Sequence, residues 1–231
     1  MVGEMRFAVV GLVSAALAAL GGPLEKARDA QDRAALGRSI QELSTAAASR
    51  PKDPAAQYKL AQAQSYLAEV SIEQRDKNAA RSAAENGIQA AEKATSLKAD
   101  SSEYHRMLGT LCGQAIAGGN LLIGMKYGKC ALDEVNKAIQ LDPKNPMGYL
   151  SRGVGNYYLP AQFGGGVDKA IADFQKTIEM DPKIPEAHLW LGVALRKANR
   201  NAEARKAFEK SLQLNPARVW AKQQLDKTPV Q

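Results

Sequence analysis

Aromatic residues are scarce in this 231-residue chain and make up only 6% of it. β-branched residues are also sparse, whereas alanine is abundant, and this mixture favours helix over strand. No segment alternates apolar and polar residues over several positions, so a sheet is not expected. Hydrophobic residues at 45% and charged residues at 24% exclude a disordered or collagen-like chain. The composition therefore predicts an all-α protein.

The sequence also lacks the side-chain patterns of common active sites. It has two histidines, His105 and His188, and two cysteines, Cys112 and Cys130. The patterns HExxH, GxSxG and CxxC do not occur. The glycine-rich stretch Gly164–Lys169 opens a helix, but it lacks the spacing and the Ser/Thr of a phosphate-binding loop, which favours a flexible turn. We predict a non-enzymatic protein with no catalytic residues, no metal site and no cofactor.

Positive charge is unevenly distributed. The formal net charge is +7, and nearly all of the excess lies between Lys183 and Gln231. Within this segment the charges alternate in sign and form no block. Either an acidic partner surface or a well-solvated terminal helix pair explains the excess. The aromatic residues that interleave with basic ones in nucleic-acid platforms are missing, so no nucleic-acid partner is expected.

The first 21 residues have the features of an export signal. Arg6 precedes an apolar run from Phe7 to Leu20, which is shorter than the ~20 residues of a membrane span and has the length of a secretory h-region. Small residues follow where a signal peptidase would cut. We predict a signal peptide over residues 1–21 and an exported protein, periplasmic or extracellular. An uncleaved membrane anchor and an apolar first helix of the fold are the alternatives.

An internal repeat is the strongest pattern in the sequence. Three segments share the order small, apolar, polar, apolar, Asp or Asn, and Pro: Ala138–Pro143, Thr177–Pro182 and Ser211–Pro216. A proline cannot continue a helix, so each segment ends one helix and redirects the chain.

These segments resemble the tetratricopeptide repeat (TPR) family, whose unit has about 34 residues. The segment Pro185–Arg218 fits at full length, with Leu191, Gly192, Phe208 and Pro216 at family positions 7, 8, 24 and 32. Small residues at positions 8 and 20 let two antiparallel helices approach closely, and large residues at positions 4, 11 and 24 fill the space around them. The resemblance implies a short right-handed solenoid of antiparallel helix pairs.

The upstream repeats are longer than the family's unit. Their insertions and extensions are the turn Tyr158–Gly166, the break Gly118–Asn120, and the long helices Ala55–Glu73 and Asn78–Leu97. We predict an array of about four helix pairs over residues 51–231, in line with the repeat spacing. Residues 22–50 are predicted to be an N-terminal helix or half-repeat, with Leu24–Ser49 as one helix.

In TPR arrays the first helix of each pair lines the concave face, so the resemblance implies a binding groove. The groove would be apolar in its C-terminal half, with arginines at its edges, and would suit an extended apolar peptide or a lipophilic small molecule. Its residues are Met147, Leu150, Val154, Tyr157, Leu189, Val193, Arg106 and Arg196. The alternative is that the inserted loops fold back and cover these side chains. Both histidines fall at position 4, where we expect them to pack between helices.

Cys112 and Cys130 fall on the two antiparallel helices of one repeat. An oxidising location would permit a disulfide between them, provided that their Cα atoms lie within ~7 Å. Two small buried hydrophobic side chains are the alternative. The sequence leaves the two readings open.

The leading functional hypothesis is a scaffold or adaptor that binds a protein or peptide, because such arrays offer a large preformed concave face. The export signal, the stretched repeats and the Tyr158–Gly166 insert also resemble the periplasmic TPR T-component associated with TRAP transporters. That second resemblance implies an apolar small-molecule ligand and self-association into a homo-oligomer. A deep enclosed pocket would favour the T-component, and an open groove on a monomer would favour the scaffold.

Overall fold

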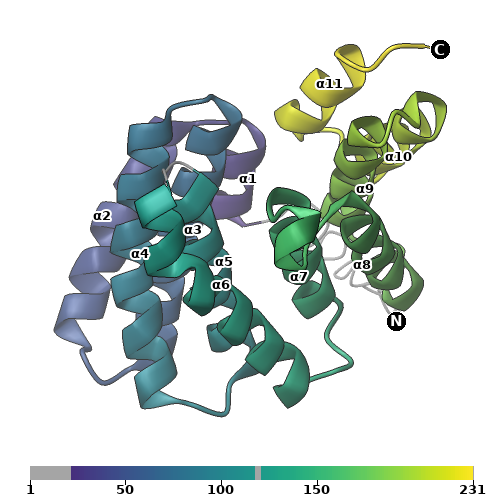
Figure 1. Cartoon of the computed structure of the whole chain (residues 1–231). Coiled ribbons are helices and arrows are strands. Elements are labelled where there is room, and N and C mark those ends of the chain that lie inside the picture. The colour runs from purple at the N-terminus through teal and green to yellow at the C-terminus, as the bar shows by residue number, and fades with distance from the viewer. Residues whose placement is uncertain (1–21, 118–120, 231) are drawn as a thin grey trace, which may run out of the picture.

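The computed structural model describes residues 22–117 and 121–230, and every regular element within these ranges is a helix (Figure 1). The all-α prediction is confirmed. The signal-peptide prediction and the predicted break at Gly118–Asn120 lie outside the described residues. The elements are α1 (Pro23–Asp29), α2 (Arg33–Ser49), α3 (Pro54–Glu73), α4 (Lys77–Leu97), α5 (Ser102–Ala117), α6 (Leu121–Leu141), α7 (Pro146–Tyr158), the 3₁₀ turn η1 (Ala161–Phe163), α8 (Val167–Met180), α9 (Pro185–Lys197), α10 (Asn201–Leu214) and α11 (Val219–Asp226).

The helices begin and end at the prolines and Asp-Pro or Asn-Pro pairs of the predicted repeat. Helices α6, α8 and α10 each end directly before the Asp-Pro or Asn-Pro pair of their repeat. Helices α3, α7 and α9 begin at a proline, which needs no hydrogen-bond partner at the first helical position. The Asp53 carboxylate accepts a hydrogen bond from the Ala55 amide at 2.9 Å, and Asn145 caps α7 in the same way.

Glycine and phenylalanine face one another between paired helices, as the repeat pattern predicts. A Cβ atom at Gly192 of α9 would lie 2.6 Å from the ring of Phe208 on α10. Gly153 of α7 stands in the same relation to Phe174 on α8, also at 2.6 Å. A larger side chain at either glycine would therefore push its helix pair apart. Positions 8 and 24 of the repeat form one contact in both C-terminal pairs.

The prediction of a single helix over Leu24–Ser49 is wrong. The chain breaks after α1, where Gln31 has a positive φ of 56° and the Asp32 carboxylate caps α2. The break lets the short helix α1 pack on both α2 and α3 instead of continuing along the array. Neither glycine nor proline marks the turn, so helical periodicity alone did not detect it.

Candidate binding cavity

The concave side of the array holds a cavity of about 550 Å³. Its wall combines α1 and α3 from the N-terminal part, α5, α6 and α7 from the middle, and α9 and α11 from the C-terminal part. Most of the lining is apolar, with Met107, Val135, Leu150, Val154, Trp190 and Trp220 among the contributing side chains. Clefts of this size and character are typical of ligand and peptide sites.

Four of the eight predicted groove residues line this cavity: Arg106, Met147, Leu150 and Val154. Leu159 and Pro160 of the predicted insert also line it. The insert therefore forms part of the cavity wall. Val154 stays partly exposed beside it, whereas Leu150 is only 6% exposed. The role of these residues in binding stays a prediction.

The other four predicted groove residues lie elsewhere. Leu189 and Val193 of α9 are only 1% and 5% exposed, within the core that α9 shares with its neighbours. Arg196 donates hydrogen bonds to the carbonyl and the side chain of Gln224 on α11, at 3.1 and 2.5 Å. Tyr157 packs edge-on against Trp190, with Lys197 over its ring. The core encloses Leu189 and Val193 and α11 binds Arg196, so this part of the expected groove is filled.

Arg106 is held in place on the cavity wall by a carboxylate and a hydroxyl. Its guanidinium donates to both oxygens of Glu103, at 2.7 and 2.5 Å, and to the Ser151 hydroxyl at 3.2 Å. Burial opposes the charge of this guanidinium, but the bonds to Glu103 outweigh burial and raise the pKa of Arg106 overall. The pair brings no net charge to the cavity.

The two ends of the array meet beside the cavity, which the repeat pattern did not predict. Arg218, at the start of α11, has a side chain that is only 1% exposed. It donates to Glu69 at 2.7 Å and also bonds Glu73, and both acceptors lie on α3. Arg28 of α1 reaches Glu186 of α9 at 2.6 Å. We call these contacts the end clasp, and they turn the concave face into a cavity with walls on both sides.

Amide side chains complete the end clasp. Asn215 donates to the Asp29 carboxylate at 2.7 Å, and Gln223 donates to the side chain of Gln31 at 3.1 Å. Gln31 in turn donates to Glu73 at 2.8 Å. The turn between α1 and α2 therefore places Gln31 where it bonds both α3 and α11. No local sequence signal could have identified these partners, because they are far apart in the chain.

Glu73 is the carboxylate most affected by the end clasp. Burial raises the pKa of Glu73, Arg218 opposes this effect and the neighbouring Glu69 adds to it, so that the pKa is raised overall to about 7. Its side chain is only 2% exposed. The end clasp thus contains a group that changes its charge near neutral pH.

Two protein families match this chain, one over its N-terminal part and the other over its C-terminal part. The family described as regulator of microtubule dynamics protein 1-3 matches residues 24–159, more than half of the chain. The protein belongs to this family. A TPR family matches residues 161–218, a range that includes the segment Pro185–Arg218, where the repeat fits at full length. No curated protein matches the sequence.

A solved structure with a TM-score above 0.5 confirms the TPR fold of this family member. The thermophilic TPR protein TTC0263 from Thermus thermophilus has 20% sequence identity and a TM-score of 0.58, over 88% of this chain and 99% of that one. YrrB, described as a TPR protein with an unusual peptide-binding site, has 17% identity and a TM-score of 0.43, over 80% of this chain and 97% of its own. The fold is that of a helical-repeat scaffold, a type that is typically non-enzymatic and serves protein interactions.

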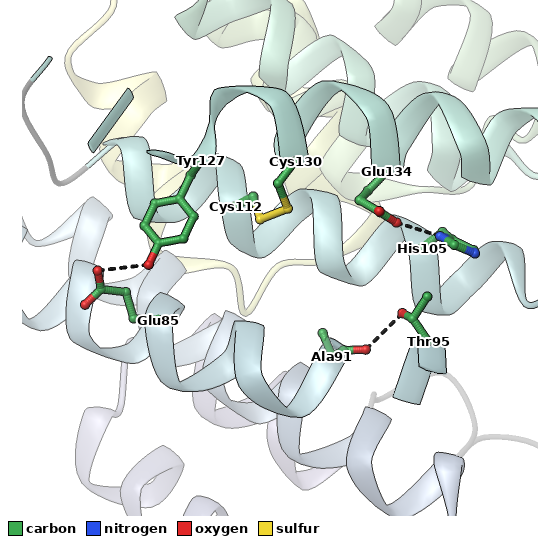
Figure 2. The surroundings of a disulfide bond; sticks show 8 residues. All are labelled: Glu85, Ala91, Thr95, His105, Cys112, Tyr127, Cys130 and Glu134. Carbon is green, nitrogen blue, oxygen red and sulfur yellow. Dashed lines mark hydrogen bonds and ion pairs between the residues drawn. A yellow bond between two sulfur atoms is a disulfide. The ribbon is translucent and has the colours of Figure 1, made fainter. Parts of the chain in front are cut away.

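A disulfide fixes the cavity wall within the region that matches the regulator of microtubule dynamics family (Figure 2). Cys112 of α5 is bonded to Cys130 of α6, with their Cα atoms 6.0 Å apart. The bond settles the alternative that the sequence left open. Tyr127 of α6 donates to Glu85 of α4 at 3.1 Å, so α6 is also tied to the preceding pair.

Both histidines of this family member have structural partners, as their repeat position predicts. His105 bonds Glu134 through Nδ1 at 2.6 Å and the Ala99 carbonyl through Nε2 at 2.9 Å (Figure 2). His188 bonds the Pro182 carbonyl through Nε2 at 3.0 Å. Across residues 22–117 and 121–230, no group of three His, Cys, Asp or Glu side chains is placed to hold a metal ion. Over the same residues, no helix combines the length and apolarity that a membrane span requires.

Proposed function

We propose that the protein is a non-enzymatic TPR adaptor whose cavity binds an apolar segment of a protein partner, in the periplasm or outside the cell. The observation that carries this proposal is the apolar lining of the 550 Å³ cavity, which continues beyond the cavity as exposed apolar side chains along α6. A preformed apolar site of this kind loses little conformational entropy when it binds an extended chain.

Helix α6 favours a peptide over a compact small molecule. Leu132 lines the cavity and is still 42% exposed. Met125 lies seven residues earlier, on the same face of the helix, and is 74% exposed, and Leu122 is 71% exposed one turn further on. Apolar surface therefore continues from the cavity along α6, where a longer ligand would cover it. Exposed apolar surface of this kind often marks an interaction site.

The disulfide supports the proposed exported location. Disulfides are rare in reducing compartments and persist in the periplasm and outside the cell. The predicted signal peptide over residues 1–21 supports the same location. The family description names microtubule dynamics. The disulfide argues against that role for this chain, because microtubules assemble in a reducing cytosol.

A second candidate function is the binding of an apolar small molecule, as in the T-component of TRAP transporters. The volume of the cavity favours this candidate, because small-molecule sites commonly span about 300–1,000 Å³. Native mass spectrometry of the protein recovered from the periplasm distinguishes the two candidates. A ring-sized oligomer that carries small-molecule mass would support the T-component role, and a ligand-free monomer would support the adaptor.

The direct test of the adaptor is a selection of random peptides from a display library on the full chain. The chain has two tryptophans, Trp190 and Trp220, and both line the cavity, so their emission reports its occupancy. Selected peptides are expected to shift this emission and to lose binding to a Val154→Asp variant. Val230→Asp is the matched control, since Val230 is 77% exposed and does not line the cavity. Peptides that bind both variants equally would refute the proposal.

A further inference from the structure

The cavity has an acidic end. Four of its lining residues there are glutamates: Glu25, Glu69, Glu73 and Glu186. Glu25 accepts a hydrogen bond from Tyr66 at 3.2 Å, and Tyr66 also lines the cavity. The remaining three belong to the end clasp. The mostly apolar lining therefore ends in a group of carboxylates that approach from α1, α3 and α9.

These carboxylates outnumber the cations beside them. Together with Asp29 there are five carboxylates, and Arg28 and Arg218 are the two guanidinium groups that bond them. Arg106 contributes nothing here, because Glu103 already neutralises it. Three negative charges remain uncompensated when all five carboxylates are ionised, and two remain when Glu73 is protonated. The partly buried position makes each of these charges more effective than it would be in open solvent.

Aromatic rings border the same end of the cavity. The Arg28 guanidinium lies 5.0 Å from the centre of the Tyr66 ring, and the Arg218 guanidinium lies 5.7 Å from that of Trp220. Trp220 and Trp190 pack edge-to-face, with their centres 5.2 Å apart. Ring faces next to an excess of carboxylates attract cations through both charge and the ring quadrupole.

We propose, on the basis of the adaptor function above, that the cavity selects a partner segment in which a lysine or arginine is flanked by apolar residues. The basic side chain enters the acidic end beside Glu25 and Glu69, and the flanking apolar side chains fill the part of the cavity lined by Leu150 and Val154. The added cation offsets one of the uncompensated negative charges beside the end clasp, and the aromatic rings contact its aliphatic stem.

The net charge of the whole chain is positive and therefore opposes the binding of basic peptides that we propose. The chain carries +7 at neutral pH, so non-specific attraction enriches acidic peptides. A selection that returns basic peptides would therefore run against the overall charge and report the local field of the cavity.

The test uses peptides selected on the full chain and measures affinity through tryptophan emission. The selected sequences are expected to contain Lys or Arg between apolar residues. Replacing that residue by norleucine should weaken binding about tenfold. Glu25→Gln and Glu69→Gln should lower the affinity for the basic peptide and leave the affinity for the norleucine peptide unchanged. Glu85→Gln is the control, because Glu85 bonds Tyr127 and does not line the cavity. Glu25 accepts a hydrogen bond from Tyr66 and lies outside the end clasp, so Glu25→Gln is the decisive variant. A lower thermal midpoint is expected for Glu69→Gln, because Glu69 also bonds Arg218.

The outcomes separate this inference from the adaptor proposal. Peptides that depend on Val154 but bind equally with lysine, norleucine or glutamate would overturn the inference and leave the adaptor standing. Unchanged affinity for the basic peptide in both glutamine variants would place the cation elsewhere and also overturn it. A selection that returns no peptide dependent on Val154 would refute the adaptor itself.

Discussion

The two halves of the array both consist of antiparallel helix pairs, but their helices differ in length and their cores differ in side-chain composition. Helices α3, α4 and α6 have 20 or 21 residues, whereas α7 to α10 have 13 or 14. The N-terminal core consists largely of alanines around Leu108 and Leu111. The C-terminal core contains the fully buried rings of Phe174 and Phe208, with Trp190 and Trp220 packed against it.

This difference shows two ways of bringing antiparallel helices together. In the C-terminal half a glycine on one helix receives an aromatic ring from the next. In the N-terminal half the buried core that the described residues form contains no aromatic ring and consists largely of alanines, and a disulfide joins α5 to α6. Small side chains bury little apolar area each, so additional length and a covalent link compensate.

The largest expected effect is the loss of an aromatic ring from the C-terminal core. Phe208→Ala should lower the free energy of unfolding by about 3–5 kcal/mol, because Gly192 cannot fill the space that the ring leaves. Leu111→Ala, at a fully buried position of the N-terminal core, should cost about 2–5 kcal/mol. Urea unfolding measures both. A loss below about 1 kcal/mol for Phe208→Ala would show that the two cores do not differ as described.

The end clasp joins the two halves, and removing its central arginine should destabilise the protein nearly as much as Phe208→Ala. Arg218→Ala leaves Glu69 and Glu73 without their cation and should cost about 3–5 kcal/mol. Small-angle scattering should show an expanded molecule. Arg200→Ala is the control, because Arg200 pairs with Glu203 in an exposed position, where solvent screens the pair and its loss should change stability little. Equal effects of the two substitutions would argue against a structural clasp.

The disulfide should stabilise the N-terminal half of the array and leave the C-terminal half unaffected. Replacing both Cys112 and Cys130 by alanine should lower stability by about 2–4 kcal/mol, because the unfolded chain regains the freedom of the closed loop. Hydrogen exchange should increase in α5 and α6 and stay unchanged in α9 and α10. Increased exchange in α9 and α10 as well would show that the two halves are not independent in this respect.

The smallest expected effect is the pH dependence of the end clasp. The pKa of Glu73 is raised to about 7, so the folded protein binds a proton that the unfolded chain releases near pH 4.5. Stability contributed by this group is therefore present at acidic pH and falls by roughly 2 kcal/mol as the pH rises from 5 to 7. Glu73→Gln should flatten this part of the profile. The check is the difference between the two urea-unfolding profiles, and parallel profiles would contradict the assignment.

Local patterns predicted the parts of the fold that depend on neighbours in sequence. The Asp-Pro and Asn-Pro pairs marked the ends of α6, α8 and α10, and the spacing of Gly192 and Phe208 predicted their contact. The turn at Gln31 escaped detection because its backbone is set by packing against α3 and by side-chain bonds to Glu73. Propensity yields to tertiary contacts at such positions.

The cavity was predictable only in the part that repeat geometry controls. Leu150 and Val154 lie on its wall because α7 follows the concave face of the array. The same rule predicted Leu189 and Val193, but both are buried in a core that also contains Ala221 of α11. The acidic end was missed entirely, because its carboxylates come from helices that no local spacing relates.

The end clasp also determines when the cavity can form during biosynthesis. In most repeat arrays each unit contacts only its neighbours, so folding proceeds along the chain. Here Arg218 bonds a residue 145 positions earlier, and Gln223 bonds one 192 positions earlier. Closing loops of this length is entropically costly and comes late in folding. The helix pairs can assemble in order as they emerge, but the binding site is complete only once the last helix of the chain has arrived.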